Sequence, residues 1–265
     1  MRLVLLPFSL FFGFIVFIRN LLYDIKVIKT FKVNKPVISI GNISTGGTGK
    51  TPIIEMIIDY LYQKELSIAI ISRGYKRKSK GSLLVSDGKK ILADYKNSGD
   101  EAFQLAKKNH NVIIGVDEKR KRIAKFLDEN YKIDLFLLDD AFQHRKMFRD
   151  LDVLVIDGGK NPFSDFLLPA GNLRESVKSI KRSDVVMVTK TTDNNFNKIK
   201  ERILEVKSLP VFRVDFEVHY FENYKGDLLN YENLNLKNII LFCGIGNPDF
   251  FIAQIINSGA KIIKK

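Results

Sequence analysis

Six short apolar runs separated by amphipathic segments follow Pro36, and this alternation restricts the fold more than any other feature. Most of the runs are continuously apolar, which is typical of strands covered on both faces. Segments between them, such as TPIIEMIIDYLYQKE and DEKRKRIAKFLDENY, have helical spacing. The pattern predicts an α/β fold with a mainly parallel sheet, in which ligands bind at the carboxyl ends of the strands. The runs are VISIG from Val37, IAIIS from Ile68, VIIGV from Val112, DLFLLDD from Asp134, DVLVID from Asp152 and DVVMVTK from Asp184.

The first run leads into a glycine-rich segment, GNISTGGTGKTP, which has the character of a phosphate-binding loop. Pro52 suits the first turn of a following helix, and a helix N-terminus attracts phosphate. Lys50 can bridge the β- and γ-phosphates, and the Thr51 hydroxyl can hold Mg²⁺. The strict pattern has glycine where Ser44 stands, and this difference changes the entry to the turn but not the backbone amides that would contact phosphate. The alternative is a glycine-rich turn that binds no ligand. The predicted nucleotide-binding residues are Ser44, Thr45, Gly46, Gly47, Thr48, Gly49, Lys50 and Thr51.

Two acidic pairs are candidates for the chemistry. Asp139 and Asp140 end an apolar run, as in the arrangement that places a carboxylate beside Mg²⁺. Asp100 and Glu101 follow a glycine and open a predicted helix, where a carboxylate can accept a proton from a substrate hydroxyl. Helix capping is the alternative for both pairs.

Basic and aromatic residues in the predicted loops complete the candidate site. Arg73 and Tyr75 lie in SRGYKR, Arg120 in DEKRKR and Arg174 in PAGNLRES. Arginine can stabilise a phosphoryl group in transfer or bind an anionic substrate. Each of these arginines is otherwise a surface residue.

The N-terminal stretch 3–18, LVLLPFSLFFGFIVFI, carries no charge. It is shorter than the roughly 18 to 20 apolar residues of a spanning helix and contains Pro7 and Gly13. We expect a helix that lies in one leaflet of a membrane, with basic residues after it contacting anionic head groups. A core helix docked on the domain is the alternative. The basic residues are Arg19, Lys26, Lys29 and Lys32.

The charge and the single cysteine restrict partners and compartment. A net charge of +13 favours an anionic partner, which can be nucleic acid, an acidic membrane or a phosphorylated substrate. Codon bias that leaves lysines on solvated faces is the alternative explanation. Cys243, in the apolar run NIILFCGIG, is predicted to be buried, and one cysteine excludes an internal disulfide. Without a cleavable secretory signal, the soluble part is expected in a reducing cytosol.

Six motifs together resemble the tetraacyldisaccharide 4'-kinase family of lipid A biosynthesis. They are GNISTGGTGKTP, SRGYKRK, GDEAFQLA, LLDDAFQHRKMFRDLDVLVID, LLPAGNLRES and FCGIGNP, in the family's order. The family's loop also lacks the first glycine. The resemblance implies ATP- and Mg²⁺-dependent phosphorylation of the 4'-hydroxyl of an anionic glycolipid, tetraacyldisaccharide 1-phosphate, at the cytoplasmic face of the inner membrane.

The resemblance also implies three groups of site residues. The catalytic group is Asp100, Lys50, Asp140, Arg120 and His144, with Asp100 as the base for the sugar hydroxyl. The substrate-binding group is Arg73, Tyr75, Arg174 and Glu175. The metal-binding group is Thr51, Glu101 and Asp139.

We expect three parts along the chain: a membrane-associated N-terminal helix at 1–30, a P-loop kinase domain at 31–194, and a linker with a partial α/β domain at 195–265. The family has a histidine in a Pro-Asp-His stretch beyond the CGIGNP motif, and this chain ends before such a stretch, so we expect it to be truncated. The alternatives are a catalytically impaired P-loop protein that serves as a membrane scaffold, and a partitioning-type ATPase, which has a signature lysine where Thr45 stands. No basic stripe interleaved with aromatics indicates nucleic-acid binding, and no obligate protein partner is evident.

Overall fold

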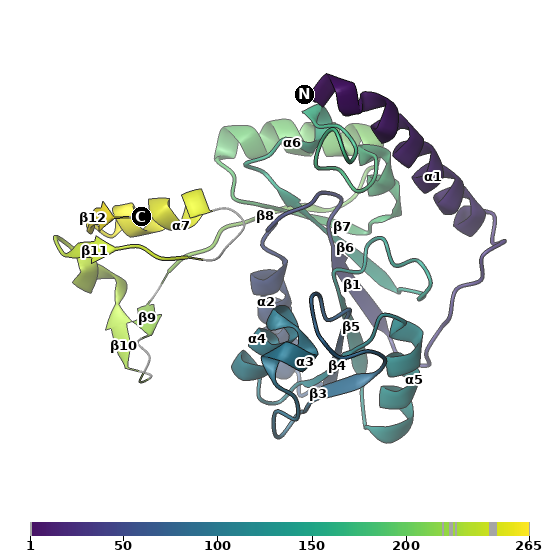
Figure 1. Ribbon diagram of the computed structural model, residues 1–265, viewed down its shortest axis with the longest axis horizontal. Coiled ribbons are helices and arrows are strands. Elements are labelled where there is room, and N and C mark those ends of the chain that lie inside the picture. Colours follow the sequence, from purple (N-terminus) through teal and green to yellow (C-terminus); the bar gives the residue numbers. More distant parts are fainter. Residues whose placement is uncertain (1, 219, 223–224, 226, 244–247, 265) are drawn as a thin grey trace.

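A computed structural model of the 265-residue chain describes residues 2–218, 220–222, 225, 227–243 and 248–264. Its centre is an eight-stranded sheet in the order β3-β4-β2-β5-β1-β6-β7-β8, in which every neighbouring pair is parallel except β3 with β4 (Figure 1). The predicted parallel α/β fold is confirmed, although β3 was not predicted. The strands are β1 (Val37–Gly41), β2 (Ile68–Ser72), β3 (Leu83–Asp87), β4 (Ile113–Val116), β5 (Leu135–Asp139), β6 (Leu151–Asp157), β7 (Val185–Thr189) and β8 (Val211–Val214).

Helices cover both faces of this sheet. On one face, Ile53, Ile54 and Ile58 of α2 (Lys50–Tyr62) pack with α4 (Asp100–Lys108) against inward residues of the central strands. The other face is covered by α5 (Arg120–Asn130) and α6 (Asp193–Val206). Each fully buried isoleucine contributes about 1.5 to 3 kcal/mol. Two-sided burial therefore explains why the strands are continuously apolar, and it holds their carboxyl ends at one edge.

The start of the region 195–265, where a linker was expected, instead belongs to helix α6, which ends at Val206. Ile199 and Ile203, four residues apart, point at the sheet and are buried, while lysines cover the outer side. The strand after it, β8, pairs with β7 and so extends the main sheet. The polar composition of α6 concealed its narrow apolar face. The division of the chain into domains stays a prediction.

Beyond β8 a smaller group of elements lies to one side of the main sheet, at the yellow end of Figure 1. The expected burial of Cys243 is wrong: this residue is exposed and lies beyond the end of β11 at Ile240. Residues 244–247 of the CGIGNP motif lie outside the described residues. The elements are β9 (Tyr220–Glu222), β10 (Leu228–Asn230), η4 (Tyr231–Leu234), β11 (Asn238–Ile240), α7 (Pro248–Asn257) and β12 (Lys261–Lys264).

Helix α1 (Leu6–Asp24) lies along the outside of the main domain (Figure 1). Ser9, Val16 and Tyr23, spaced seven residues apart, form its buried stripe, and the Ser9 hydroxyl donates to Leu167 O at 2.8 Å. Six large apolar residues remain 50 to 75% exposed: Phe8, Leu10, Phe11, Phe14, Ile15 and Phe17. Among the described helices, α1 alone is long and apolar enough to cross a membrane, and 17% of its apolar window is buried. The helix is thus docked by a narrow stripe and keeps a wide apolar face uncovered.

Short helices complete the described elements. They are η1 (Arg2–Leu5), α3 (Tyr95–Ser98), η2 (Pro162–Ser164) and η3 (Val177–Arg182).

Candidate functional site

The carboxyl ends of β1, β2 and β5 open into a cavity of about 750 Å³. The register of β1 on β5 sets Ile40 opposite Asp139, so the glycine-rich loop and the acidic pair leave the sheet side by side. Thr45, Gly46 and Lys50 of the loop line this cavity. The strand-end rule predicted the ligand site at this edge of the sheet, and the structure has a cleft lined by these residues there.

The glycine-rich loop has the backbone that only glycine adopts easily. Gly46 and Gly49 have φ of 97° and 82°, and Gly49 caps α2 in the left-handed conformation without a side-chain bond. The Thr189 hydroxyl donates to Thr48 O at 2.9 Å, and the Lys190 ammonium donates to Gly47 O. Carbonyls of the loop thus point to β7 and its end. Such loops direct their amides to phosphate.

The loop is also held at its entry. Ser44, which stands where the strict pattern has glycine, forms an antiparallel bridge with Leu173. The next amide, Thr45 N, donates to Asn172 O at 2.8 Å. The Asn42 side chain donates to the Thr48 hydroxyl at 3.1 Å. The entry is therefore an extended segment paired with residues 172–173.

The two adjacent aspartates have opposite electrostatic environments. Burial and the neighbouring Asp140 raise the pKa of Asp139, which accepts a hydrogen bond of 2.9 Å from the Ser72 hydroxyl. Burial also disfavours the charged form of Asp140, but Lys50 and Arg174 outweigh it, so the pKa of Asp140 is lowered. Lys50 Nζ lies 3.3 Å from Asp140 Oδ1, and Arg174 Nη1 lies 2.8 Å from Asp140 Oδ2. Neighbouring carboxyls with pKa values moved apart are typical of sites that handle protons and cations.

Arg120 is 4% exposed and holds the turn after β5. Its Nη2 donates to Asp139 O at 2.6 Å and to Asp140 O at 3.0 Å. Asp140 has a positive φ of 44°, an uncommon conformation outside glycine, and these bonds stabilise it. Arg120 therefore orients the aspartates through their backbone.

His144 lines the same cavity in its neutral form. Burial and the positive charges of Arg120 and Arg149 lower the pKa of His144 to about 4. At neutral pH the imidazole can donate or accept a hydrogen bond but is a weak base.

The acidic residues that open α4 differ in position. Gly99, with φ of 87°, lets the chain pass Tyr75 O, which a Cβ there would meet at 2.7 Å. Glu101 lines the cavity, and burial together with the charge of Asp139 raises its pKa. Asp100 is exposed in the first turn and does not line this cavity.

The predicted substrate residues also divide. Arg73, Tyr75 and Arg174 line the cavity. Glu175 is fully buried outside it, beneath α1, where Arg182 and Arg19 hold its pKa below the usual value against the opposing effect of burial.

Several contributing residues were absent from the predicted set. Ser72 and Thr189 end predicted strands, so the rule that ligands bind at strand ends contained a signal for them. Gln143 donates to Asn42 O at 2.8 Å, and Arg19 reaches the cavity from α1. No local sequence pattern indicates a role in the site for either residue, because both positions depend on packing between distant segments.

A loop of this geometry between a buried parallel strand and a helix belongs to the P-loop nucleotide-binding proteins. The cavity beside Lys50 has room for a second molecule next to the loop, as in enzymes that transfer a phosphoryl group to an acceptor. The chain therefore belongs to the class of P-loop kinases. The profile described as Tetraacyldisaccharide-1-P 4'-kinase matches residues 1–265, and the chain belongs to that family. The resemblance found in the motifs is confirmed.

Relatives and a solved structure agree with this assignment. The tetraacyldisaccharide 4'-kinase of Chlorobaculum tepidum is 37% identical over 263 residues, which are 98% of this chain and 75% of that protein. That of Chlorobium limicola is 37% identical over 262 residues, with the same shares. The crystal structure of LpxK from Aquifex aeolicus in complex with ATP is 35% identical, with a TM-score of 0.80 over 99% of this chain and 80% of that one.

Proposed function

We propose that this chain transfers the γ-phosphate of ATP to the 4'-hydroxyl of tetraacyldisaccharide 1-phosphate, an anionic glycolipid, in lipid A biosynthesis. Family membership supports the reaction, and the related protein from Aquifex aeolicus was crystallised with ATP. One observation carries the proposal: the cavity that is lined by Lys50, Glu101 and Asp140 is also lined by Arg19, from the helix with the apolar face. The nucleotide loop and a surface suited to lipid therefore meet at one cleft.

The glycine-rich loop is proposed to hold the triphosphate. Amides of residues 44–51 and the N-terminus of α2 attract the phosphates, and Lys50 lies beside them. Lys50 is now paired with Asp140, and this ion pair orients the ammonium before ATP binds.

Magnesium fits the oxygen donors at this position. Within the described part of the chain, no three His, Cys, Asp or Glu side chains gather as a metal site. Mg²⁺ ordinarily takes few protein ligands together with phosphate oxygens, and Thr51, Asp139 and Glu101 supply a hydroxyl and two carboxylates. The bound ion would neutralise charge on the phosphates. Burial and neighbouring carboxylates raise the pKa values of Asp139 and Glu101, and a bound cation would stabilise the ionised form of both groups.

The acceptor hydroxyl is proposed to enter from the α4 side of the cavity. Asp100 remains the predicted base; it lies in the first turn of α4, next to Glu101, which lines the cavity. Arg73, Tyr75 and Arg174 are proposed to contact the anionic sugar. Arg120 and His144, which line the same cavity, complete the predicted catalytic set.

The uncovered face of α1 is proposed to insert into the cytoplasmic leaflet of the inner membrane. Each large apolar side chain transferred from water contributes about 1.5 to 3 kcal/mol, and six of them lie on this face. The net charge of +13 adds attraction to anionic lipid.

A transfer assay with radiolabelled ATP and tetraacyldisaccharide 1-phosphate tests the reaction. Lys50→Ala is expected to lower the rate by roughly 100-fold or more, because it removes a positive charge at the transferring phosphate. Lys64→Ala, which changes an exposed lysine just past the other end of α2, is the matched control and is expected to retain the rate. Both variants should still sediment with anionic vesicles. Wild-type rates in Lys50→Ala, or an inactive wild type, would contradict the proposal.

A further inference from the structure

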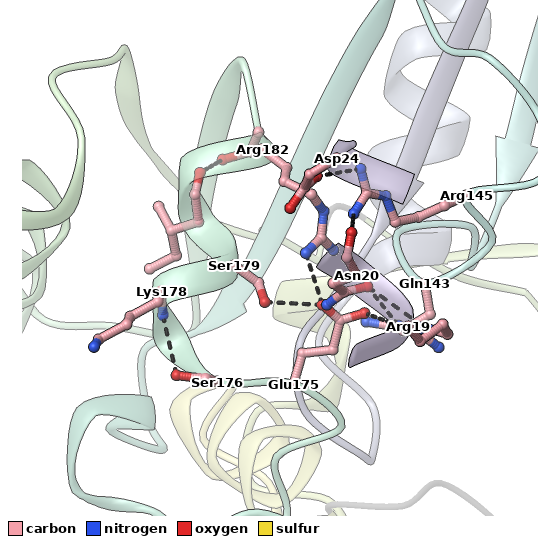
Figure 2. Close-up of polar contacts among 12 residues, drawn as sticks. Arg19, Asn20, Asp24, Gln143, Arg145, Glu175, Ser176, Lys178, Ser179 and Arg182 are labelled. Atoms are coloured by element: carbon pink, nitrogen blue, oxygen red, sulfur yellow. Dashed lines mark hydrogen bonds and ion pairs between the residues drawn. The ribbon is translucent and has the colours of Figure 1, made fainter. Parts of the chain in front are cut away.

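The carboxylate of Glu175 is fully buried where the C-terminal half of α1 meets η3 (Figure 2). From α1, Arg19 Nη2 donates to Oε1 at 2.7 Å and Asn20 Nδ2 donates to Oε2 at 3.0 Å. From η3, the Ser179 hydroxyl donates to Oε2 at 2.8 Å, and Arg182 Nη1 lies 2.8 Å from the same oxygen. One carboxylate therefore joins the apolar helix to the main domain through four donors.

The residue before it, Arg174, belongs to the catalytic cleft. Its backbone amide donates to Ile43 O at 2.7 Å, and its guanidinium donates to Asp140 Oδ2 at 2.8 Å. Two residues earlier, Asn172 O accepts from Thr45 N. Residues 172–175 thus contact the nucleotide loop through Asn172 and Arg174 and contact α1 through Glu175.

A second contact links the same end of α1 to the other side of the nucleotide loop. Arg145 donates to Asn20 O at 3.0 Å and to Asp24 Oδ1 at 2.7 Å (Figure 2). Gln143, two residues before Arg145, donates to Asn42 O at the start of the loop. Two segments that contact the nucleotide loop, 172–175 and 143–145, are therefore both hydrogen-bonded to α1.

A buried charged network of this kind is poorly explained by stability. The free energy needed to remove two ions from water offsets the attraction between them, so replacing a buried ion pair by apolar residues often leaves the stability of the fold unchanged or raises it. Directional hydrogen bonds instead hold the groups that they join in one defined relative position. The Arg182 guanidinium, 4.5 Å from the ring centroid of the fully buried Phe142, extends the network to the segment that follows Asp140.

We propose that Glu175 is a positioning residue. Through Glu175, the position of α1 on the domain determines the position of the Arg174 side chain in the cleft, and Arg174 in turn positions Asp140. This inference rests on the proposed kinase function. It replaces the sequence-based role of Glu175 as a substrate ligand, since the buried carboxylate does not line the cavity. Lipid engaged by α1 then acts on the catalytic geometry through residues 172–175.

Asn20→Ala is the informative variant, because Asn20 contacts Glu175 and lines none of the cavity. Glu175→Gln keeps the shape and removes the charge. Lys178→Gln is the matched control, since Lys178 is an exposed residue of η3 whose side chain points away from the network in Figure 2. Each variant is assayed for kcat and for KM of both substrates, and for amide hydrogen exchange of residues 42–49.

Asn20→Ala and Glu175→Gln are expected to lower kcat about tenfold or more with the lipid KM unchanged, since small displacements of catalytic groups act on the chemical step. The double variant should lose no more than Glu175→Gln alone, and exchange at residues 42–49 should accelerate in both single variants. Lys178→Gln should match wild type.

An unchanged kcat and exchange rate in Asn20→Ala, or a raised lipid KM at constant kcat in Glu175→Gln, would overturn the proposal. If Glu175→Gln does not fold, Asn20→Ala decides alone. If the wild type transfers no phosphate, the kinase assignment fails, while the exchange measurement still tests the coupling between α1 and the loop.

Discussion

Replacing His144 by glutamine is expected to remove a defined part of the acid sensitivity of the folded state. Burial, together with the smaller effects of the positive charges of Arg120, Arg149, Lys146 and Arg73, lowers the pKa of His144 from 6.5 to about 4. The unfolded chain therefore binds a proton at this histidine in a range of pH where the folded chain does not.

The sign and size follow from this difference. His144 contributes full stability above the unfolded pKa of 6.5, and the contribution is lost progressively as the pH falls toward about 4. Between about pH 8 and about pH 5, linkage with these two values gives a loss of about 2 kcal/mol in the free energy of unfolding. Glutamine cannot titrate, so this loss should be absent in the variant.

Urea unfolding of wild type and His144→Gln at both pH values measures the difference directly. The exposed His110 gives a matched control, because His110→Gln should keep the wild-type pH dependence. A rate profile adds a second test: if the imidazole is neutral throughout the working range, no kinetic pKa between about 5 and 8 should vanish in His144→Gln. Equal pH dependence of stability in wild type and His144→Gln would refute the argument.

Two further variants test the packing of the site. Ser72→Ala should raise the pKa of Asp139 further, because it removes the hydroxyl that donates to the carboxylate; we expect a loss of kcat that is larger at the acid end of a pH–rate profile than at its alkaline end. Gly41→Ala should cost about 1 to 3 kcal/mol in urea unfolding, because its Cβ would lie 2.6 Å from Phe142 N. Gly47→Ala, where a Cβ meets nothing within 4 Å, should unfold like wild type. Equal stabilities for the two glycine variants would contradict the close approach at Gly41.

The elements predicted best are those whose signal is contiguous. Continuous apolar runs identified six strands of the main sheet, because burial on both faces leaves no polar alternation. The antiparallel strand β3 was missed, and α6 was taken for a linker. In α6 only two residues, Ile199 and Ile203, are buried, so the polar composition of the segment is typical of a loop. The four-residue spacing of these isoleucines is the feature that indicates a helix.

The predicted site residues divide in the same way. Lys50 and Asp140 stand in local motifs, and the structure brings them within 3.3 Å. Asp100 and Glu101 are adjacent, but only Glu101 lines the cavity. Whether a residue lines a cavity depends on neighbours from other elements, which a local motif does not record.

The amino-acid sequence by itself determined the parallel α/β class, the nucleotide loop and the apolar N-terminal helix, because each is encoded by residues near one another in the chain. Tertiary structure alone decided which distant groups meet. Arg174 and Glu175 are consecutive, yet one side chain reaches Asp140 in the cleft and the other is buried under α1. What lies beside each of these side chains is fixed only when the sheet, its loops and α1 have packed together.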